Sequence, residues 1–219
     1  GVCPFPGAST GTGGRIRDTI AVGRGARFLS SYVGYSVGCI HNSDLEIENT
    51  TTESLINEDY KIGWNYPYHK PVDILIKASN GASDYGNKIG EPVILGYTRS
   101  YGGLVNNERI EYVKPIMYCG GIGTMLYRNK DKITPEQGFL VVRVGGPAYN
   151  IGLGGGSASS RNQDSTNKSK DFNAVQRGDP QMENRVARFV ETCSNIVVTA
   201  LLLLFYKLIL FDQTRRVSR

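Results

Sequence analysis

A short glycine-rich stretch near the start of the sequence has the residue types that bind phosphate. Residues 4–18 read PFPGASTGTGGRIRD and contain four glycines, three small hydroxyl residues, two arginines and one aspartate. Glycine permits positive φ and leaves backbone N–H groups open to a ligand. Arginine donates forked hydrogen bonds to phosphate, and aspartate can hold Mg²⁺. The stretch therefore predicts a nucleotide-phosphate loop, and a flexible surface loop of the same composition is the alternative.

Two widespread nucleotide motifs do not fit this stretch. No Gly-Lys-Ser/Thr sequence ends it, which excludes a P-loop, and Ile16 stands three residues after Gly13, where the dinucleotide motif needs a glycine. The phosphate site must therefore be of another kind.

The composition suits a folded, loop-rich protein of the α/β or α+β class. The chain has 219 residues, 40% of them hydrophobic, and 27 glycines. Its net charge of +5 is concentrated in residues 1–30 and 194–219, which argues against a general nucleic-acid surface. The first basic cluster fits a polyphosphate or sugar-phosphate ligand, with a solvated basic loop as the alternative.

The four cysteines are too far apart in sequence to suggest a zinc site or a disulfide framework. They stand at positions 3, 39, 119 and 193 with no C-x-x-C pair, which favours a reducing compartment. The sequence begins with Gly1 and shows no signal peptide, so we expect a cytoplasmic fragment of a longer protein.

Hydrophobic patterns predict four strands and one well-marked helix. The expected strands are residues 32–40, 72–78, 112–119 and 139–144, the last being the clearest. The helix begins with Asp179 as N-cap and Pro180 at its first position. Its apolar face comprises Met182, Val186, Phe189, Val190 and Cys193. Polar residues 42–56 and 159–170 read as an exposed insertion and a mobile segment.

The last residues form an apolar run of a different character. Ile196–Phe211 is interrupted only by Thr199 and Lys207, and two arginines follow. The run is shorter than the roughly 20 residues that a transmembrane helix needs. Three interpretations of this run are open: a divergent or wrongly joined C-terminus, a buried helix, or a membrane anchor.

Several blocks, taken together and in order, resemble phosphoribosylformylglycinamidine synthase, the glutamine-dependent ligase of purine biosynthesis. The resemblance covers residues 1 to about 193, and Arg15 stands where the bacterial long form usually has Glu, so the eukaryotic long form is the better match. The matching blocks are residues 7–18, 23–25, 78–88, 114–117, 119–123, 144–160 and 172–180.

The resemblance implies a fold of two units of the aminoimidazole-ribonucleotide-synthetase-like (PurM-like) type. An α/β unit lacking its start is expected over residues 1–113, and a truncated α+β unit over 114–193. Residues 194–219 form a divergent apolar tail. Pairing of such units, between chains or internal repeats, normally builds a shared barrel and completes the site.

The implied reaction is the ATP-dependent conversion of formylglycinamide ribonucleotide to its amidine. ATP phosphorylates the amide oxygen to an iminophosphate, and ammonia from a glutaminase domain outside this chain displaces the phosphate. The cofactors are ATP and Mg²⁺, with no nucleic acid or membrane partner, and the fragment alone is expected to be inactive. The alternatives are a non-catalytic Mg-nucleotide-binding half-module that supports a partner, and a small-molecule kinase of the same superfamily.

Carried over by position, the resemblance assigns ligand roles within the first block and near residue 176. Asp18 would bind Mg²⁺, and Arg17 and Gln176 would contact the substrate. No catalytic residue is expected, because the family histidine lies upstream of Gly1. The ATP-binding residues would be Gly7, Ala8, Ser9, Thr10, Gly11, Thr12, Gly13, Gly14, Arg15, Ile16, Arg17 and Asp18.

Four other features carry weaker expectations. Gly152–Ser157 could cradle a phosphate or simply pack a strand against a helix. Asn87 and Lys88 belong to a block that resembles a nucleotide-proximal loop. His41 and His69 stand in poorly matching segments and are expected to be surface residues.

Overall fold

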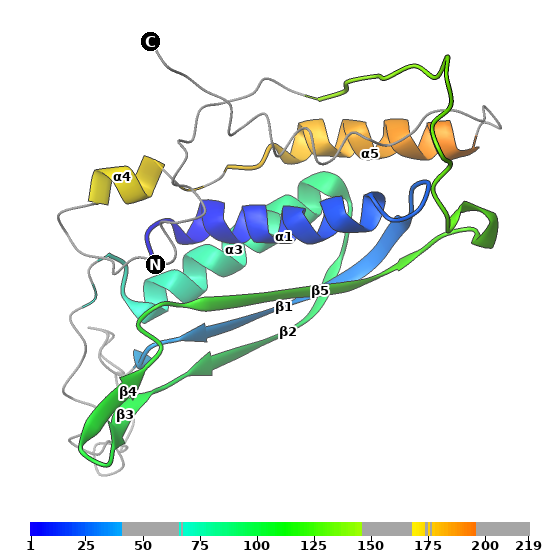
Figure 1. Ribbon diagram of the computed structural model, residues 1–219. Coiled ribbons are helices and arrows are strands. Elements are labelled where there is room, and N and C mark those ends of the chain that lie inside the picture. The colour runs from blue at the N-terminus through cyan, green and yellow to red at the C-terminus, as the bar shows by residue number, and fades with distance from the viewer. Residues whose placement is uncertain (41–65, 67, 146–167, 174, 176, 196–219) are drawn as a thin grey trace.

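Helices cover one face of a three-stranded sheet (Figure 1). The computed structural model describes residues 1–40, 66, 68–145, 168–173, 175 and 177–195. The central strand β1 (Arg27–Val37) pairs in parallel with β2 (Val93–Ser100) and antiparallel with β5 (Ile116–Thr124). The described part of the chain is therefore a mixed α/β structure, as the composition predicted.

Two long helices pack side by side on the sheet, and a third lies over them. The first two are α1 (Pro4–Ile20) and α3 (Pro71–Ile89), and α5 (Pro180–Asn195) covers both (Figure 1). Smaller elements are the hairpin of β3 (Gly102–Val105) and β4 (Glu108–Glu111), the 3-10 helix η2 (Tyr127–Asn129) and α4 (Lys168–Asn173).

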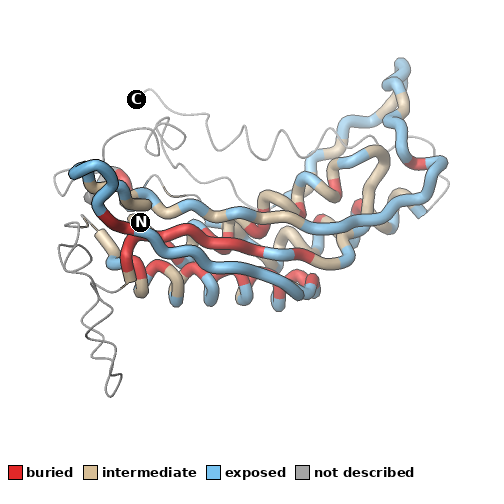
Figure 2. Tube along the Cα trace, turned by 90° about the horizontal axis from the view of Figure 1, so that it is seen from below, coloured by how far each residue is buried: buried red, intermediate tan, exposed pale blue. Residues whose placement is uncertain are grey.

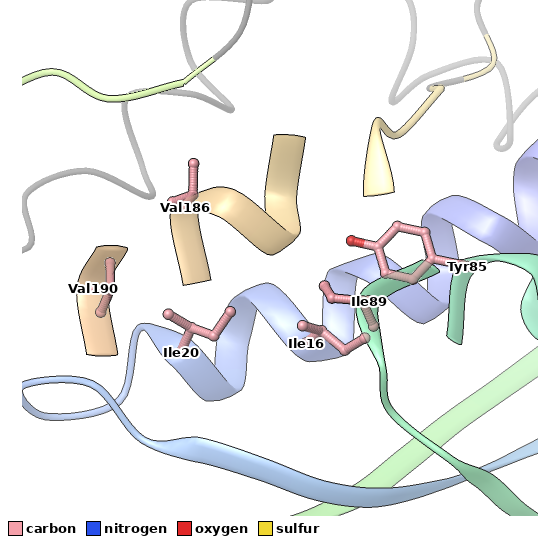
Figure 3. Packing of buried hydrophobic residues seen from close by; sticks show 6 residues of the cluster. All are labelled: Ile16, Ile20, Tyr85, Ile89, Val186 and Val190. Atoms are coloured by element: carbon pink, nitrogen blue, oxygen red, sulfur yellow. The ribbon is translucent and has the colours of Figure 1, made fainter. Parts of the chain in front are cut away.

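Two apolar clusters hold these layers together. Between the three helices lie Ile16, Ile20, Tyr85, Ile89, Val186 and Val190 (Figure 3). Between the helices and the sheet lie Ala8, Val33, Tyr35, Ala78 and Ala82. The central strand is the most buried of the three, whereas β2 and much of β5 are exposed (Figure 2).

The glycine-rich stretch is helical, so the prediction of a loop there is wrong. Pro4 occupies the first turn of α1, and no glycine between residues 4 and 20 has positive φ. The glycines serve close packing instead: a Cβ on Gly13 would lie 2.7 Å from the Tyr85 ring. On the facing helix, a Cβ on Gly81 would lie 2.2 Å from the Phe5 carbonyl oxygen. Missing side chains thus let α1 and α3 approach.

Residues 72–78 are helical, so the strand predicted there is also wrong. They form the start of α3, whose buried positions Ile74, Ala78, Ala82, Tyr85 and Ile89 recur at helical spacing. The helix ends at Gly90, whose φ of 82° is the left-handed conformation that glycine adopts readily. Asn87 and Lys88 lie in this helix, not in a loop.

Of the remaining predicted elements, two strands and the start of one helix are confirmed and one strand is wrong. The expected strands at 32–40 and 112–119 overlap β1 and β5, and the N-terminus of α5 is confirmed because Asp179 Oδ1 accepts from Met182 N at 3.0 Å. The strand predicted at 139–144 is wrong, because those residues are not in a sheet. Leu140 and Val141 are 76% and 81% exposed there.

Four further predictions fall wholly or partly outside the described residues. Residues 42–56, 152–157 and 196–211 lie outside the described residues, and so does 159–167, whereas residues 168–170 begin α4. The division of the chain near residue 113 stays a prediction. Of the helices that the structure describes, none has both the length and the hydropathy that a bilayer crossing requires.

Candidate functional site

Two blocks that the sequence singled out, far apart along the chain, adjoin in space. A Cβ added to Gly178 would lie 3.9 Å from Thr10 Oγ1 and 3.5 Å from the Tyr85 ring. The helix of the first block and the segment leading into α5 therefore lie side by side. Gln176, the expected substrate contact in that segment, lies outside the described residues.

Arg17 is held by a carboxylate of α5. Its Nη1 lies 3.0 Å from both Oε1 and Oε2 of Glu183, and its Nη2 donates to the Thr10 carbonyl at 3.4 Å. Glu183 also accepts a hydrogen bond from the Tyr85 hydroxyl. This network joins α1, α3 and α5, and both charged side chains are largely buried, with 11% and 17% exposed. A substrate that contacts Arg17 must share the guanidinium with Glu183.

Arg15 makes a second link, from α1 to the start of β2. Both of its Nη atoms donate to the carboxylate of Glu91, whose side chain is fully buried. The guanidinium lies against Gly121 of β5, and its buried Nε has no hydrogen-bond partner among the described residues. A buried pair of this kind fixes the position of one element against another.

The basic cluster of residues 1–30 is thus engaged within the protein. Arg27 pairs with Glu191, and Arg24 donates to the Arg128 carbonyl, so each of the four arginines has a protein partner. The cluster alone therefore does not indicate a free polyphosphate site.

The hydroxyl residues of the first block face different surroundings. Thr12 is fully buried and its Oγ1 donates to the Ala8 carbonyl at 3.0 Å, and Ser9 is also buried. Gly7 is exposed, and its N–H donates to the Cys3 carbonyl at 2.9 Å. Pro4 and Pro6 have no N–H, so the N-terminus of α1 offers few free backbone donors to an anion.

Asp18 is exposed on the last turn of α1. Within the described residues no group of three or more His, Cys, Asp or Glu side chains gathers to hold a metal ion. A metal ion at Asp18 would therefore take further ligands from a bound nucleotide or from other parts of the protein.

The neighbouring side chains of the predicted site have their own partners. Arg177 donates to the carbonyls of Val175 and Phe172 at 3.1 and 3.2 Å, and its guanidinium stacks on the Phe172 ring. Lys88 pairs with Asp84 at 2.7 Å. His69 Nδ1 lies 3.2 Å from Lys77 Nζ, and His41 lies outside the described residues.

Burial lowers the reactivity expected of the nearby cysteine. The pKa of the Cys119 thiol is raised by burial, and Arg15 opposes the shift only partly. A raised pKa leaves little thiolate at neutral pH. All four cysteines are free thiols.

Sequence reasoning missed the carboxylates and the tyrosine that organise this site. Glu183 stands in the first turn of α5, where an acidic residue reads simply as favourable to the helix dipole. Its partner Arg17 is 166 residues away. No local pattern signals that pairing, nor the pairing of Arg15 with Glu91.

Comparison with known proteins shows which proteins this chain is similar to in sequence. By fold it is a mixed α/β protein, and no family model matches its sequence. It is 51% identical to the phosphoribosylformylglycinamidine synthase of Dictyostelium discoideum and 48% identical to that of Homo sapiens. A probable chloroplastic/mitochondrial synthase of Arabidopsis thaliana is also 48% identical. Each alignment covers 88% of this chain.

The chain is therefore homologous to one segment of eukaryotic phosphoribosylformylglycinamidine synthases, which confirms the resemblance seen in its sequence. It spans only 13–14% of the length of these relatives. A solved structure titled "T. maritima PurL complexed with FGAR" superposes with a TM-score of 0.44 and 20% identity, over 89% of this chain and 25% of that one. This likeness is too low to define the fold.

Proposed function

We propose that this chain is part of a ligase that makes formylglycinamidine ribonucleotide during purine biosynthesis in the cytoplasm. The observation that carries the proposal is the 48–51% identity to named synthases over 88% of the chain. The reaction would consume ATP and glutamine-derived ammonia, with a glutaminase domain supplied outside this segment. It would pass through an iminophosphate on the substrate amide.

In this proposal the first block and the segment before α5 form one side of the ligand site. Residues 7–18 would line the nucleotide, and Asp18, on the last turn of α1, would hold Mg²⁺. Arg17 and Gln176 would contact the ribonucleotide. The adjacency of Thr10 and Gly178 supports this grouping, because a site built from both blocks needs them side by side.

The proposal also includes a fold made of PurM-like units that pair through their sheets. The sheet face opposite the helices carries exposed apolar side chains, among them Leu95 at 68% and Ile122 at 66%. Tyr32 and Tyr118 lie on the same face and are also exposed. An apolar face of this kind favours contact with a second unit.

Nucleotide binding tests the assignment of Asp18. We expect Asp18→Ala to weaken Mg-ADP binding at least tenfold in titration calorimetry, because the carboxylate that holds the metal ion is gone. Asp131→Ala is the matched control: that carboxylate is 83% exposed and lies outside the proposed site. Equal affinity for wild type and Asp18→Ala would overturn the assignment.

Turnover separates the ligase from the half-module alternative. We expect native protein immunoprecipitated from cell extract with an antibody against residues 159–180 to form the amidine from formylglycinamide ribonucleotide, ATP and ammonia. On a blot we expect a band well above 24.0 kDa, the mass of this chain. A band at 24.0 kDa that binds Mg-ADP without turnover would favour the non-catalytic half-module.

A further inference from the structure

A second concave site lies beside the C-terminal end of α1, away from the contact between Thr10 and Gly178. A cavity of about 480 Å³ opens where the C-terminal halves of α1 and α5 meet the start of β1 and the end of β5. Ile20 lines it, whereas Thr10 lies in the first site, and these residues are separated by about 15 Å along the helix. None of the residues assigned to the nucleotide or the substrate lines this cavity.

The floor of the cavity is apolar. It is formed by Ile20, Ile89 and Val190, which belong to the buried cluster between the helices (Figure 3). Phe28, which packs against this cluster, also lines the cavity. Leu126 lies at the wall and is 51% exposed. Such a surface favours the flat or branched hydrocarbon part of a ligand.

The rim of the cavity carries an excess of positive charge. Arg27 is paired with Glu191, so these two side chains neutralise one another. Arg188 also lines the cavity, and its guanidinium has no partner within the described part of the chain. Asn184 is fixed beside it, because its Nδ2 donates to the Ile89 carbonyl at 2.9 Å. The rim therefore offers one uncommitted cation above an apolar floor.

We infer that this cavity binds an amphipathic monoanion, an apolar ring system with one sulfonate, carboxylate or phosphate group. The anionic group would meet Arg188 and the rings would rest on Ile20 and Val190. A cavity of about 150 Å³ holds one benzene molecule, so the volume admits about three rings. This site is separate from the proposed nucleotide site and stands whether or not the proposed ligase activity is correct.

The probe that matches this description is 8-anilinonaphthalene-1-sulfonate, which has three aromatic rings and one sulfonate. We expect fluorescence titration of the full chain to show one saturable site, and Arg188→Gln to raise the dissociation constant about tenfold. Arg188→Lys should retain most of the affinity. Arg185→Gln is the matched control, because Arg185 is exposed on the same helix, does not line the cavity, and its loss changes the net charge equally.

The exposed sheet face is the competing place for an apolar dye, so a third variant distinguishes the two. Ile122→Lys places a charge on that face and should leave the titration unchanged. Loss of the saturable site in Ile122→Lys, an equal effect of Arg185→Gln and Arg188→Gln, or no saturable binding at all would each overturn the proposal.

Discussion

Gly13 marks a point of close approach between α1 and α3. In an exposed helix, replacing Gly with Ala stabilises by about 1 kcal/mol. Here the new Cβ would lie 2.7 Å from Tyr85, which is fully buried and hydrogen-bonded to Glu183. Overpacking outweighs the helix propensity, so we expect Gly13→Ala to lower the free energy of unfolding by about 1–3 kcal/mol in urea denaturation.

Gly7 supplies the control for this prediction. It lies in the same helix, and no atom lies within 4 Å of a Cβ built on it. Gly7→Ala should therefore raise stability by up to about 1 kcal/mol. If both variants were stabilised alike, the contact between Gly13 and Tyr85 would not limit the helix packing.

Tyr35 carries a pH dependence at alkaline pH. Burial raises its pKa to about 12, whereas in the unfolded chain the phenol ionises near its ordinary value of about 10. Between these values the unfolded chain releases the proton and the folded chain keeps it. The free energy of unfolding therefore falls as pH rises from about 10 to 12, by about 1 kcal/mol or more.

Tyr35→Phe isolates this contribution. The variant loses the hydrogen bond from the hydroxyl to the Ala78 carbonyl, so its stability is lower at neutral pH. Its stability should nevertheless fall less steeply than that of the wild type between pH 9 and 12, as chemical denaturation at each pH would measure. Parallel pH profiles would show that Tyr35 ionises normally in the folded protein.

At the scale of elements, Glu183 decides how α5 sits on the other two helices. Glu183→Gln removes the charge that faces Arg17, and it leaves a largely buried guanidinium without its ion pair. We expect a loss of about 2–3 kcal/mol in the free energy of unfolding, somewhat below the cost typical of fully buried pairs.

A matched pair on the same helix serves as control. Glu191→Gln breaks the ion pair with Arg27. The Arg27 side chain is 61% exposed and the Glu191 side chain is 41% exposed. The expected loss is below about 1 kcal/mol, because water screens exposed charges. Equal losses for Glu183→Gln and Glu191→Gln would mean that the Arg17 pair is not effectively buried.

Elements were predictable where their signals are local. The start of α5 depends on Asp179 and Pro180, adjacent residues whose preferences agree, and it was predicted correctly. The start of α3 reads as a strand in the sequence because residues 72–78 form a short apolar run. Its helical period becomes clear only when Ala82, Tyr85 and Ile89 are included. Seven residues are too few to distinguish the spacing of apolar residues in a helix from that in a buried strand.

The glycine-rich helix and the site depended on contacts that no local pattern contains. Glycine lowers helix propensity, so residues 7–14 read as a loop, yet packing against α3 overrides that preference. The resemblance assigned ligand roles to the block around Thr10 and to the segment around Gly178, and the structure places these two segments side by side. The sequence contained no sign that Glu183 and Glu91 would engage the two arginines.

On the scale of the whole molecule, the layers are unequal: helices cover one face of the sheet and the other face is open. Leu95 and Ile122 on that face are about two-thirds exposed, so they contribute little to the stability of the isolated chain. Tyr32 belongs to β1, which lies between β2 with Leu95 and β5 with Ile122. Apolar side chains on neighbouring strands favour a partner that covers all three at once.

Ile122→Lys tests whether this face pairs with a second unit, which the proposed fold requires. We expect the free energy of unfolding to change by less than about 0.5 kcal/mol, because the side chain is 66% exposed. Sedimentation equilibrium should show concentration-dependent self-association in the wild type and none in the variant, since pairing would bury an unpartnered charge. Ile76→Lys, at a 56% exposed position of α3, should associate like the wild type. If Ile76→Lys abolished association and Ile122→Lys did not, the helical side of the molecule would be the interface and the proposed barrel would be wrong.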